Sequence, residues 1–81
     1  MKDMSTKTSK PLPKWFDGTV YDKGDTVSNP YTGEWADLSA EELSMYDLIK
    51  GAEFTNNYTI LRKGLDWFRR ANAEAYMTLL D

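Results

Sequence analysis

The start of a helix is marked by Leu38-Ser39-Ala40-Glu41-Glu42-Leu43, the clearest local signal in the chain. The Ser39 hydroxyl can accept a hydrogen bond from the Glu42 amide, and the Glu42 carboxylate can reach back to the Ser39 amide, which makes a capping box. Leu38 and Leu43 occupy the two positions of a hydrophobic staple. Both glutamates also lie at the positive end of the helix dipole. This stretch predicts a helix that begins directly after Ser39.

The first helix carries a broad apolar stripe and is predicted to end near Asn56-Asn57, with Asn57 capping the next helix. From Tyr58 to Leu79 the apolar residues recur at the i, i+3, i+4, i+7 spacing of one helix face. A second cap at Asn72 would split this segment, and the spacing leaves both a continuous and a split helix open. Either way, the sequence predicts two antiparallel helical segments joined by a short turn.

Before the first helix, the sequence predicts short strands and turns. Strand composition occurs in Thr19-Val20-Tyr21 and in Thr26-Val27-Ser28, which we expect to be joined by a hairpin loop with Gly24 at a positive φ. A second turn over residues 29–33 then leads into a third short strand, Glu34-Trp35-Ala36. Strands of about three residues need a helix packed against them to persist.

Eighty-one residues provide one domain at most. Residues 1–14 are rich in Ser, Thr and Lys and end in a Pro-Leu-Pro segment, so we interpret them as a flexible basic arm. We expect the chain to dock at Trp15-Phe16 and residues 15–81 to form a single small α+β domain. Its predicted fold is predominantly helical: a short N-terminal β-meander followed by a helical hairpin, or by three helices if Asn72 breaks the last one.

The chain contains neither histidine nor cysteine. Histidine is the most frequent general acid or base, cysteine is a strong nucleophile, and together they make nearly all structural zinc sites. Asp22-Lys23-Gly24-Asp25 has two carboxylates around a glycine but lacks the further ligands and closing glutamate of a calcium loop, which favours a turn. The sequence therefore predicts a protein that is not an enzyme and that uses no cofactor, metal or small-molecule substrate.

The net charge of −3 is distributed in zones. Residues 1–14 carry four lysines and one aspartate, residues 15–57 carry nine acidic residues and two lysines, and residues 58–81 carry four basic and three acidic residues. These charges fit an ordinary solvated surface, and they also fit an acidic middle segment that occupies a basic surface of a partner. The aspartates that would test the second interpretation are Asp22, Asp25 and Asp37.

A small basic patch is predicted beside Trp67, formed by Arg62, Lys63, Arg69 and Arg70. Basic and aromatic residues together can bind nucleic acid. The sequence pI of about 4.8 argues against this function, because a protein that binds duplex DNA presents several phosphate contacts on a positive face. Nucleic acid is therefore not the partner we expect.

Trp67 is the position that we single out as an interface candidate. On a helical wheel it lies at the edge of the main stripe and widens the apolar face to about half the circumference, although a helix needs an arc of only about 100° to pack on its own domain. The additional apolar surface of the helix packs either against the strands or against a partner, and the sequence leaves both possibilities open. Tryptophan and arginine are enriched at interface hot spots. The interface candidates are Trp67, Ile60, Met77, Arg69 and Arg70 in the last helices, and Trp35 and Tyr31 in the extended part.

Three stretches carry a resemblance to known proteins. They are Asn29-Pro30-Tyr31-Thr32-Gly33-Glu34 through Leu38-Ser39-Ala40-Glu41-Glu42, then Met45-Tyr46-Asp47-Leu48-Ile49-Lys50-Gly51, and Ala71-Asn72-Ala73-Glu74-Ala75-Tyr76. This pattern resembles small uncharacterised proteins encoded by tailed phages of marine bacteria. The resemblance implies a small accessory protein without a cofactor, and it transfers no site residues.

The function that we predict is that of a small non-enzymatic interaction or structural accessory protein. Its partner is a protein or a second copy of the chain, and self-association as a homodimer through the C-terminal helices is one form of it. The alternative is a regulator that binds a cellular or host protein through the acidic middle segment. Because no stretch approaches the ~20 apolar residues of a membrane span, we expect a soluble, intracellular protein without a membrane partner, in the host cytoplasm if a phage encodes it.

Overall fold

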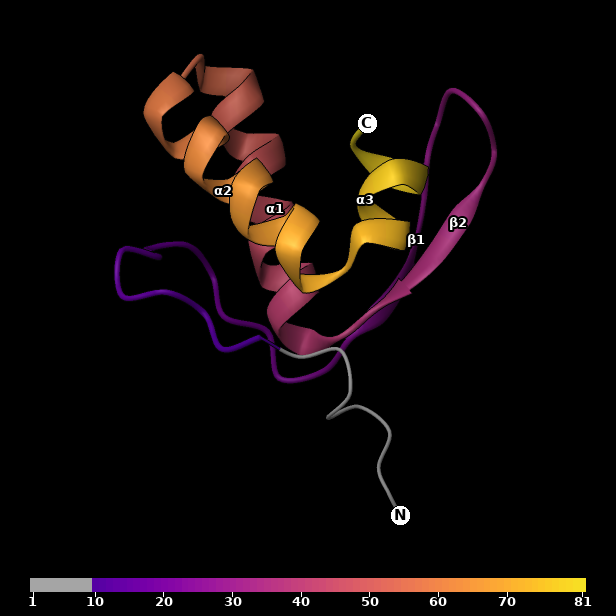
Figure 1. The fold of residues 1–81 in the computed structure, drawn as a ribbon, viewed down its shortest axis with the longest axis horizontal. Coiled ribbons are helices and arrows are strands. Elements are labelled where there is room, and N and C mark those ends of the chain that lie inside the picture. Colours follow the sequence, from indigo (N-terminus) through magenta and orange to yellow (C-terminus); the bar gives the residue numbers. More distant parts are fainter. Residues whose placement is uncertain (1–9) are drawn as a thin grey trace.

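The computed structural model of the chain describes residues 10–81 (Figure 1). Its elements, in chain order, are β1 (Asp25–Ser28), β2 (Trp35–Leu38), α1 (Ala40–Thr55), α2 (Tyr58–Ala71) and α3 (Ala73–Leu79). The predicted class, α+β and predominantly helical, is confirmed. Helices α1 and α2 form a hairpin, and the β1–β2 hairpin and α3 lie together on one side of it (Figure 1). Among the described residues, no helix is both long enough and apolar enough to cross a membrane.

The sheet consists of the two antiparallel strands β1 and β2. Because successive side chains of a strand point to opposite faces, the register divides the hairpin residues into an inner and an outer set. The inner set faces the helices and consists of Asp25, Val27, Ala36 and Leu38. The outer set consists of Thr26, Ser28, Trp35 and Asp37, all of which are exposed.

The prediction of a strand over residues 19–21 is wrong. This segment pairs with no strand; it passes α1, where the Tyr21 amide donates to the Ser44 hydroxyl at 2.9 Å. The structure therefore has one two-stranded hairpin in place of the predicted three-stranded meander. Its strand β2 corresponds to the strand predicted at Glu34-Trp35-Ala36. The turn between β1 and β2 closes it, since the Asn29 amide donates to the Glu34 carbonyl oxygen at 2.7 Å.

Two glycines shape this region for different reasons. Gly33 has a φ of 79° in the turn that closes the hairpin, a conformation that side chains disfavour. Gly24 does not have the positive φ that the sequence predicts. Its backbone instead passes so close to the end of β2 that a Cβ atom there would overlap the Leu38 carbonyl oxygen. Gly24 is thus needed for a close approach of two chain segments.

Helix α1 begins and ends as predicted. The Glu42 amide donates to Ser39 Oγ at 3.1 Å, and the Ser39 amide donates to Glu42 Oε1 at 3.0 Å, so the capping box is confirmed. Asn56 follows the helix in the left-handed conformation, with a φ of 59°. The Ile60 amide then donates to Asn57 Oδ1 at 3.3 Å, which confirms Asn57 as the cap of α2.

The core lies where α1 and α2 meet the inner face of the hairpin and α3. Met45 and Ile49 from α1 and Phe68 from α2 are fully buried. Leu38 of β2 and Leu79 of α3 belong to the same buried cluster, so every element from β2 onward contributes to one core. Burial of one such side chain contributes about 1.5–3 kcal/mol to folding.

Asn72 separates α2 from α3, so the split form of the last helical segment is the correct one of the two interpretations that the sequence left open. Its Oδ1 accepts from the Ala75 amide at 3.1 Å and so caps α3. Its Nδ2 donates to Oε1 of Glu42 at 3.2 Å, and Glu42 is only 1% exposed. One buried carboxylate oxygen therefore serves both the start of α1 and the α2–α3 break, which fixes α3 relative to α1.

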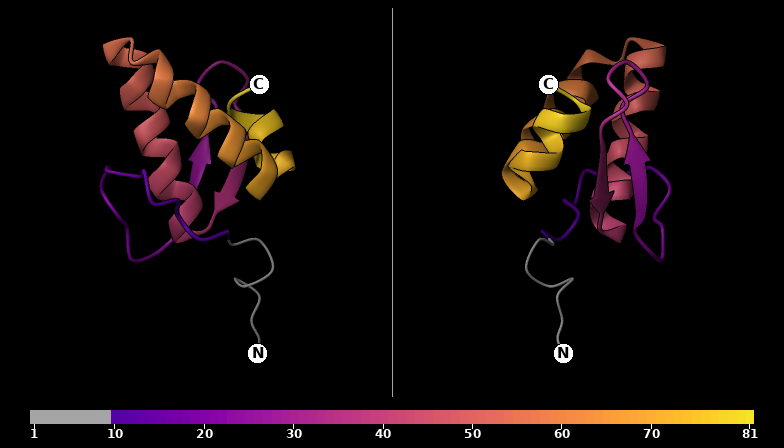
Figure 2. Two further views of the ribbon diagram at one scale, coloured as in Figure 1. Left: turned by 60° about the vertical axis from the view of Figure 1, so that its left-hand side comes forward. Right: turned by 90° about the vertical axis from the view of Figure 1, so that its right-hand side faces the viewer.

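The segment from Lys10 to Gly24 runs over the helices before β1 begins (Figures 1 and 2). Leu12, Trp15 and Phe16 pack against the core. Contact with the domain therefore starts earlier than the predicted docking point at Trp15-Phe16. The remainder of the predicted flexible arm, residues 1–9, lies outside the described residues.

Candidate interaction surface

Trp67, the first candidate from the sequence, belongs to the core of this chain. It is 8% exposed, and its indole N–H donates to the Pro11 carbonyl oxygen at 3.2 Å. The rings of Trp67 and Phe68 meet edge to face, with their centroids 6.3 Å apart. The N-terminal segment of the same chain thus covers the excess width of the α2 face. The sequence left only the strands or a partner open, because it placed Pro11 in a flexible arm.

Trp15 is also used by the fold. It is partly buried against the core, and the Lys63 ammonium nitrogen lies 5.5 Å from the centroid of its ring. This is a cation–π contact, in which a positive charge is attracted to the negative face of the aromatic ring. The chain therefore covers two of its three tryptophans with its own residues.

Trp35 has a different environment, because it stands on the outer face of the hairpin and is 63% exposed. In the right-hand view of Figure 2 the hairpin lies in front of α1, and no helix of the described chain covers this face. The residue opposite Trp35 on β1 is Ser28, whose small side chain cannot cover an indole ring. Asp37, two residues further along β2, projects from the same face.

The turn at the tip of the hairpin carries Tyr31, which is 93% exposed. The backbone beneath it is held in place: the Tyr31 amide donates to Asn29 Oδ1 at 2.8 Å. Asn29 Nδ2 in turn donates to the Thr78 carbonyl oxygen of α3 at 3.0 Å. Tyr31 is therefore an exposed aromatic residue on a turn that is attached to the helical part of the protein.

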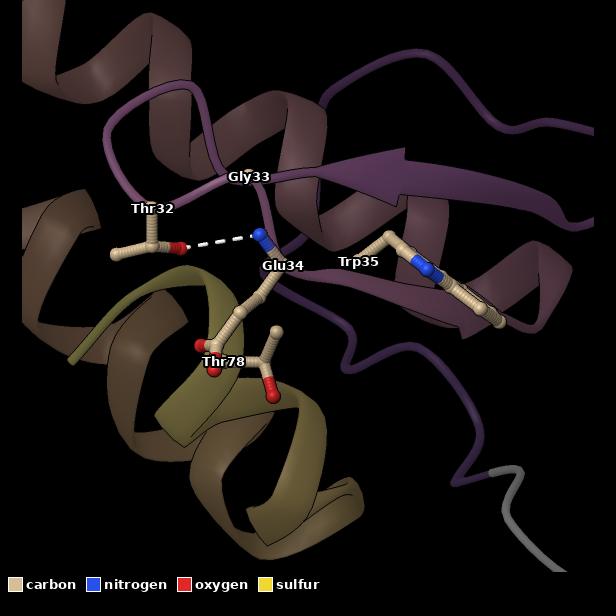
Figure 3. Close-up of a pocket in the computed structure, with 5 residues that line it drawn as sticks. All are labelled: Thr32, Gly33, Glu34, Trp35 and Thr78. Atoms are coloured by element: carbon tan, nitrogen blue, oxygen red, sulfur yellow. Dashed lines mark hydrogen bonds between the residues drawn. The ribbon is translucent and has the colours of Figure 1, made fainter.

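A cleft of about 370 Å³ lies between this turn and α3. Its lining residues are Thr32, Gly33, Glu34, Trp35 and Thr78. Figure 3 shows the Glu34 side chain directed toward Thr78 and the Trp35 ring directed away from both. The Glu34 amide donates to Thr32 Oγ1 at 3.1 Å. The cleft is mostly polar, and the Trp35 ring is not directed into it.

The other interface candidates lie on the helices. Ile60 is partly buried, and Met77 on α3 is 66% exposed. Arg69 and Arg70 are exposed, but both pair with Asp66, at 2.8 Å and 3.3 Å respectively. Of the predicted set, Tyr31 and Trp35 both belong to the hairpin, Tyr31 at its turn and Trp35 on its outer face, whereas the basic pair and Trp67 belong to α2.

Sequence reasoning missed two exposed aromatic residues near the α1–α2 turn, Phe54 at 90% and Tyr58 at 63% exposure. The exposure of Phe54 could have been predicted from the helix period. Phe54 follows the buried Ile49 by five residues, so it lies about 140° around the helix from Ile49, away from the buried face. Tyr58 was assigned to the apolar stripe of α2, but it is the first residue of that helix, directly after the α1–α2 turn, and its side chain is exposed. Its hydroxyl donates to Asn56 Oδ1 at 3.3 Å.

The hairpin surface is acidic. Residues 22–38 contain four carboxylates and one lysine, and all five side chains are exposed. The Thr26 hydroxyl donates to Asp37 Oδ1 across the strands, and the Thr26 amide donates to Asp25 Oδ1 at 2.7 Å. On α1, by contrast, Lys50 is paired: its hydrogen bond with Glu53, at 3.1 Å, raises the pKa of the Lys50 ammonium above its ordinary value.

Within residues 10–81, no group of three acidic side chains is placed to hold a metal ion. What the hairpin presents is an indole ring beside a carboxylate, together with an exposed phenol at its tip. No family model matches the chain, and the comparisons with curated proteins and with solved structures gave no match. The resemblance to phage accessory proteins therefore stays a prediction.

Proposed function

We propose that this chain is a non-enzymatic interaction protein that binds a protein partner through the outer face and the turn of its β1–β2 hairpin. The observation that carries the proposal is the exposure of Trp35, at 63%, and Tyr31, at 93%, beside a core to which neither belongs. Tryptophan and tyrosine are enriched at protein interfaces, where they bury a large area at a small entropic cost.

Self-association is one form of this function, but the surface we propose for it differs from the C-terminal helices predicted from the sequence. Trp67 is not available there, because it is 8% exposed and its indole N–H donates to the Pro11 carbonyl oxygen of the same chain. Of the large apolar residues on α3, Met77 is exposed. A homodimer would therefore bury Trp35 and Tyr31, with Met77 outside or at the margin.

The alternative form is a regulator that occupies a basic surface of a cellular protein. Its support is the exposure of Asp22, Asp25 and Asp37 around the same hairpin. Charge reversal at these three positions should abolish such binding, and salt should weaken it, because exposed charges are screened. Binding that is insensitive to salt would exclude this form.

The experiment compares the wild type with a Trp35→Ala/Tyr31→Ala variant in two assays. Light scattering after size-exclusion chromatography, at protein concentrations up to about 100 μM, measures self-association. Cross-linking in an extract of the source cells measures binding to another protein. We expect the wild type to form a complex in one assay and the double variant to lose it. A wild type that stays monomeric and forms no complex that the variant loses would contradict the proposal.

A further inference from the structure

We propose that the outer face of the hairpin binds an arginine side chain from an extended segment of a partner protein, with the guanidinium stacked on Trp35 and paired with Asp37. This inference rests on the proposed function and adds the chemistry of the partner. It begins from two side chains that the fold leaves unused on one face. Trp35 and Asp37 are two residues apart on β2, so they stand side by side at a separation of roughly 7 Å.

The Asp37 carboxylate is oriented but only partly used. The Thr26 hydroxyl, directly across the hairpin, donates to Oδ1 of Asp37. Within residues 10–81, the other oxygen, Oδ2, has no hydrogen-bond partner. Trp35 is 63% exposed, and among the same residues no aromatic ring or cation is stacked on its indole; the residue opposite it is the small Ser28. The hairpin thus offers an aromatic plane and a fixed carboxylate oxygen next to each other.

A guanidinium group fits this pair better than an ammonium group. It is planar, so it can stack on an indole ring while its N–H groups donate to a carboxylate at its edge. An ammonium is a compact, strongly hydrated charge and satisfies only one of the two contacts well. The molecule already shows the simpler pairing elsewhere, where Lys63 lies 5.5 Å from the centroid of the Trp15 ring.

The charge of the hairpin favours a cationic partner. Asp37 lies on the outer face itself, Asp22, Asp25 and Glu34 are exposed elsewhere on or beside the hairpin, and Lys23 is the one cation of residues 22–38. Complementary charge raises the rate of encounter and repels acidic competitors. An acidic or neutral segment would leave the Asp37 carboxylate uncompensated at the interface.

The partner is another protein and not a second copy. All three arginines of the chain lie on a helix, α2, and none lies in an extended segment of the kind proposed here; two of them, Arg69 and Arg70, are in addition paired with Asp66. Addition of a strand to the edge of β1 is also hindered. The Thr26 amide, which points outward from this edge, already donates a hydrogen bond to Asp25 Oδ1 at 2.7 Å and is not free to pair with another strand. The contact therefore uses side chains of the face and not the backbone of the edge.

The test uses the full chain labelled with ¹⁵N and two short synthetic peptides, in which threonine alternates with arginine or with lysine. The three indole N–H signals report separately on Trp15, Trp35 and Trp67. We expect the arginine peptide to shift the Trp35 signal selectively and to bind about two- to fivefold more tightly than the lysine peptide, as an exposed cation–π contact would produce. Addition of salt should weaken both peptides.

Two pairs of matched variants complete the experiment. Trp35→Ala and Asp37→Asn should each weaken binding of the arginine peptide, whereas Phe54→Ala and Asp47→Asn, exposed residues on α1 outside the hairpin, should not. An unshifted Trp35 signal, equal binding of the two peptides or equal effects of the control variants would overturn the inference. If the arginine peptide fails while Trp35→Ala still abolishes a complex in extract or in light scattering, the proposed function stands and only the arginine assignment falls.

Discussion

Trp67 and Trp35 divide the molecule into a helical part that the chain completes by itself and a hairpin that it leaves open. Trp67 is 8% exposed and donates to Pro11, whereas Trp35 is 63% exposed on a sheet face that no helix of residues 10–81 covers. The two residues have the same size and the same polar group, so residue type does not explain the difference. What differs is whether another segment of the same chain reaches them.

The two regions also differ in how polar groups are treated. In the helical part, Glu42 is buried and its Oε1 accepts two hydrogen bonds, from Ser39 and Asn72. In the hairpin, carboxylates face solvent and one oxygen of Asp37 is free within the described residues. The two bonds to Glu42 Oε1 tie the start of α1 to the α2–α3 break, although Glu42 Oε2 is buried without a hydrogen-bond partner among the described residues. The exposed oxygen of Asp37, by contrast, is accessible to a partner from solvent. The comparison therefore assigns stability to the helices and supports the proposal that the hairpin is the recognition surface.

The largest effect should come from Trp67→Ala, which we expect to lower the free energy of unfolding by about 3–5 kcal/mol, the usual cost of removing a buried tryptophan. Urea denaturation followed by circular dichroism measures it. Trp67→Phe keeps much of the apolar volume but loses the hydrogen bond to Pro11, so it should cost less. A loss below about 1 kcal/mol for the alanine variant would mean that the N-terminal segment does not hold Trp67 in the core.

The Glu42–Asn72 pair offers a second test, in which the cap of α3 is kept. Asn72→Asp leaves a good capping residue but places a carboxylate against the buried Glu42, so we expect a loss of about 1–3 kcal/mol. Asn72→Ser also keeps the cap and should cost less. Adding Glu42→Gln to Asn72→Asp should restore part of the stability, because the Gln amide can donate to the new carboxylate. No rescue in this double-mutant cycle would mean that the two residues do not interact.

Alanine substitutions at two glycines should change the stability of the protein in opposite directions, one at the hairpin and one in helix α1. Gly24→Ala should destabilise the protein by about 1–3 kcal/mol, because its Cβ would overlap the backbone at the end of β2. Gly51→Ala is the matched control: apart from its chain neighbours and the backbone of its own helix, no atom of the described residues lies within 4 Å of its added Cβ, and the position is exposed in the interior of α1. It should raise stability by up to about 1 kcal/mol, and thermal melts of both variants measure the contrast.

The smallest effect concerns the pH dependence that Lys50 contributes. Its pKa is raised in the folded protein by Glu53, so its contribution to stability is complete below the ordinary value of 10.5 and is lost as the pH rises through the folded pKa. The stability difference between wild type and Lys50→Met should therefore be constant near neutrality and shrink above that pH. Urea midpoints measured from neutral to alkaline pH reveal it. Glu53→Gln should remove the shrinkage, and a difference that grows with pH would contradict the assignment.

Much of the helical part is predictable because its signals are local. The Ser39–Glu42 capping box, the break at Asn56-Asn57 and the cap at Asn72 all depend on residues within four positions of one another, and the structure has all three. The choice between a continuous and a split last helix needed one long-range fact. Asn72 binds Glu42, which lies 30 residues away in the chain.

The hairpin and the surface were harder to predict because they depend on segments distant in sequence. Residues 19–21 have strand composition, but the Tyr21 amide finds Ser44 on α1 in place of a strand partner. The cover on Trp67 comes from Pro11, which is 56 positions away. No local pattern reveals either contact. Tyr31 and Trp35 were identified because short strands offer little area in which to bury an aromatic ring.

The central claim, that the fold does not use Trp35, is tested most directly by the free energy of unfolding of Trp35→Ala in urea. We predict a value within about 0.5 kcal/mol of the wild type, as for other exposed positions outside the core. A loss of several kcal/mol, comparable to that of a buried tryptophan, would contradict the claim and would make the hairpin face part of the folded core.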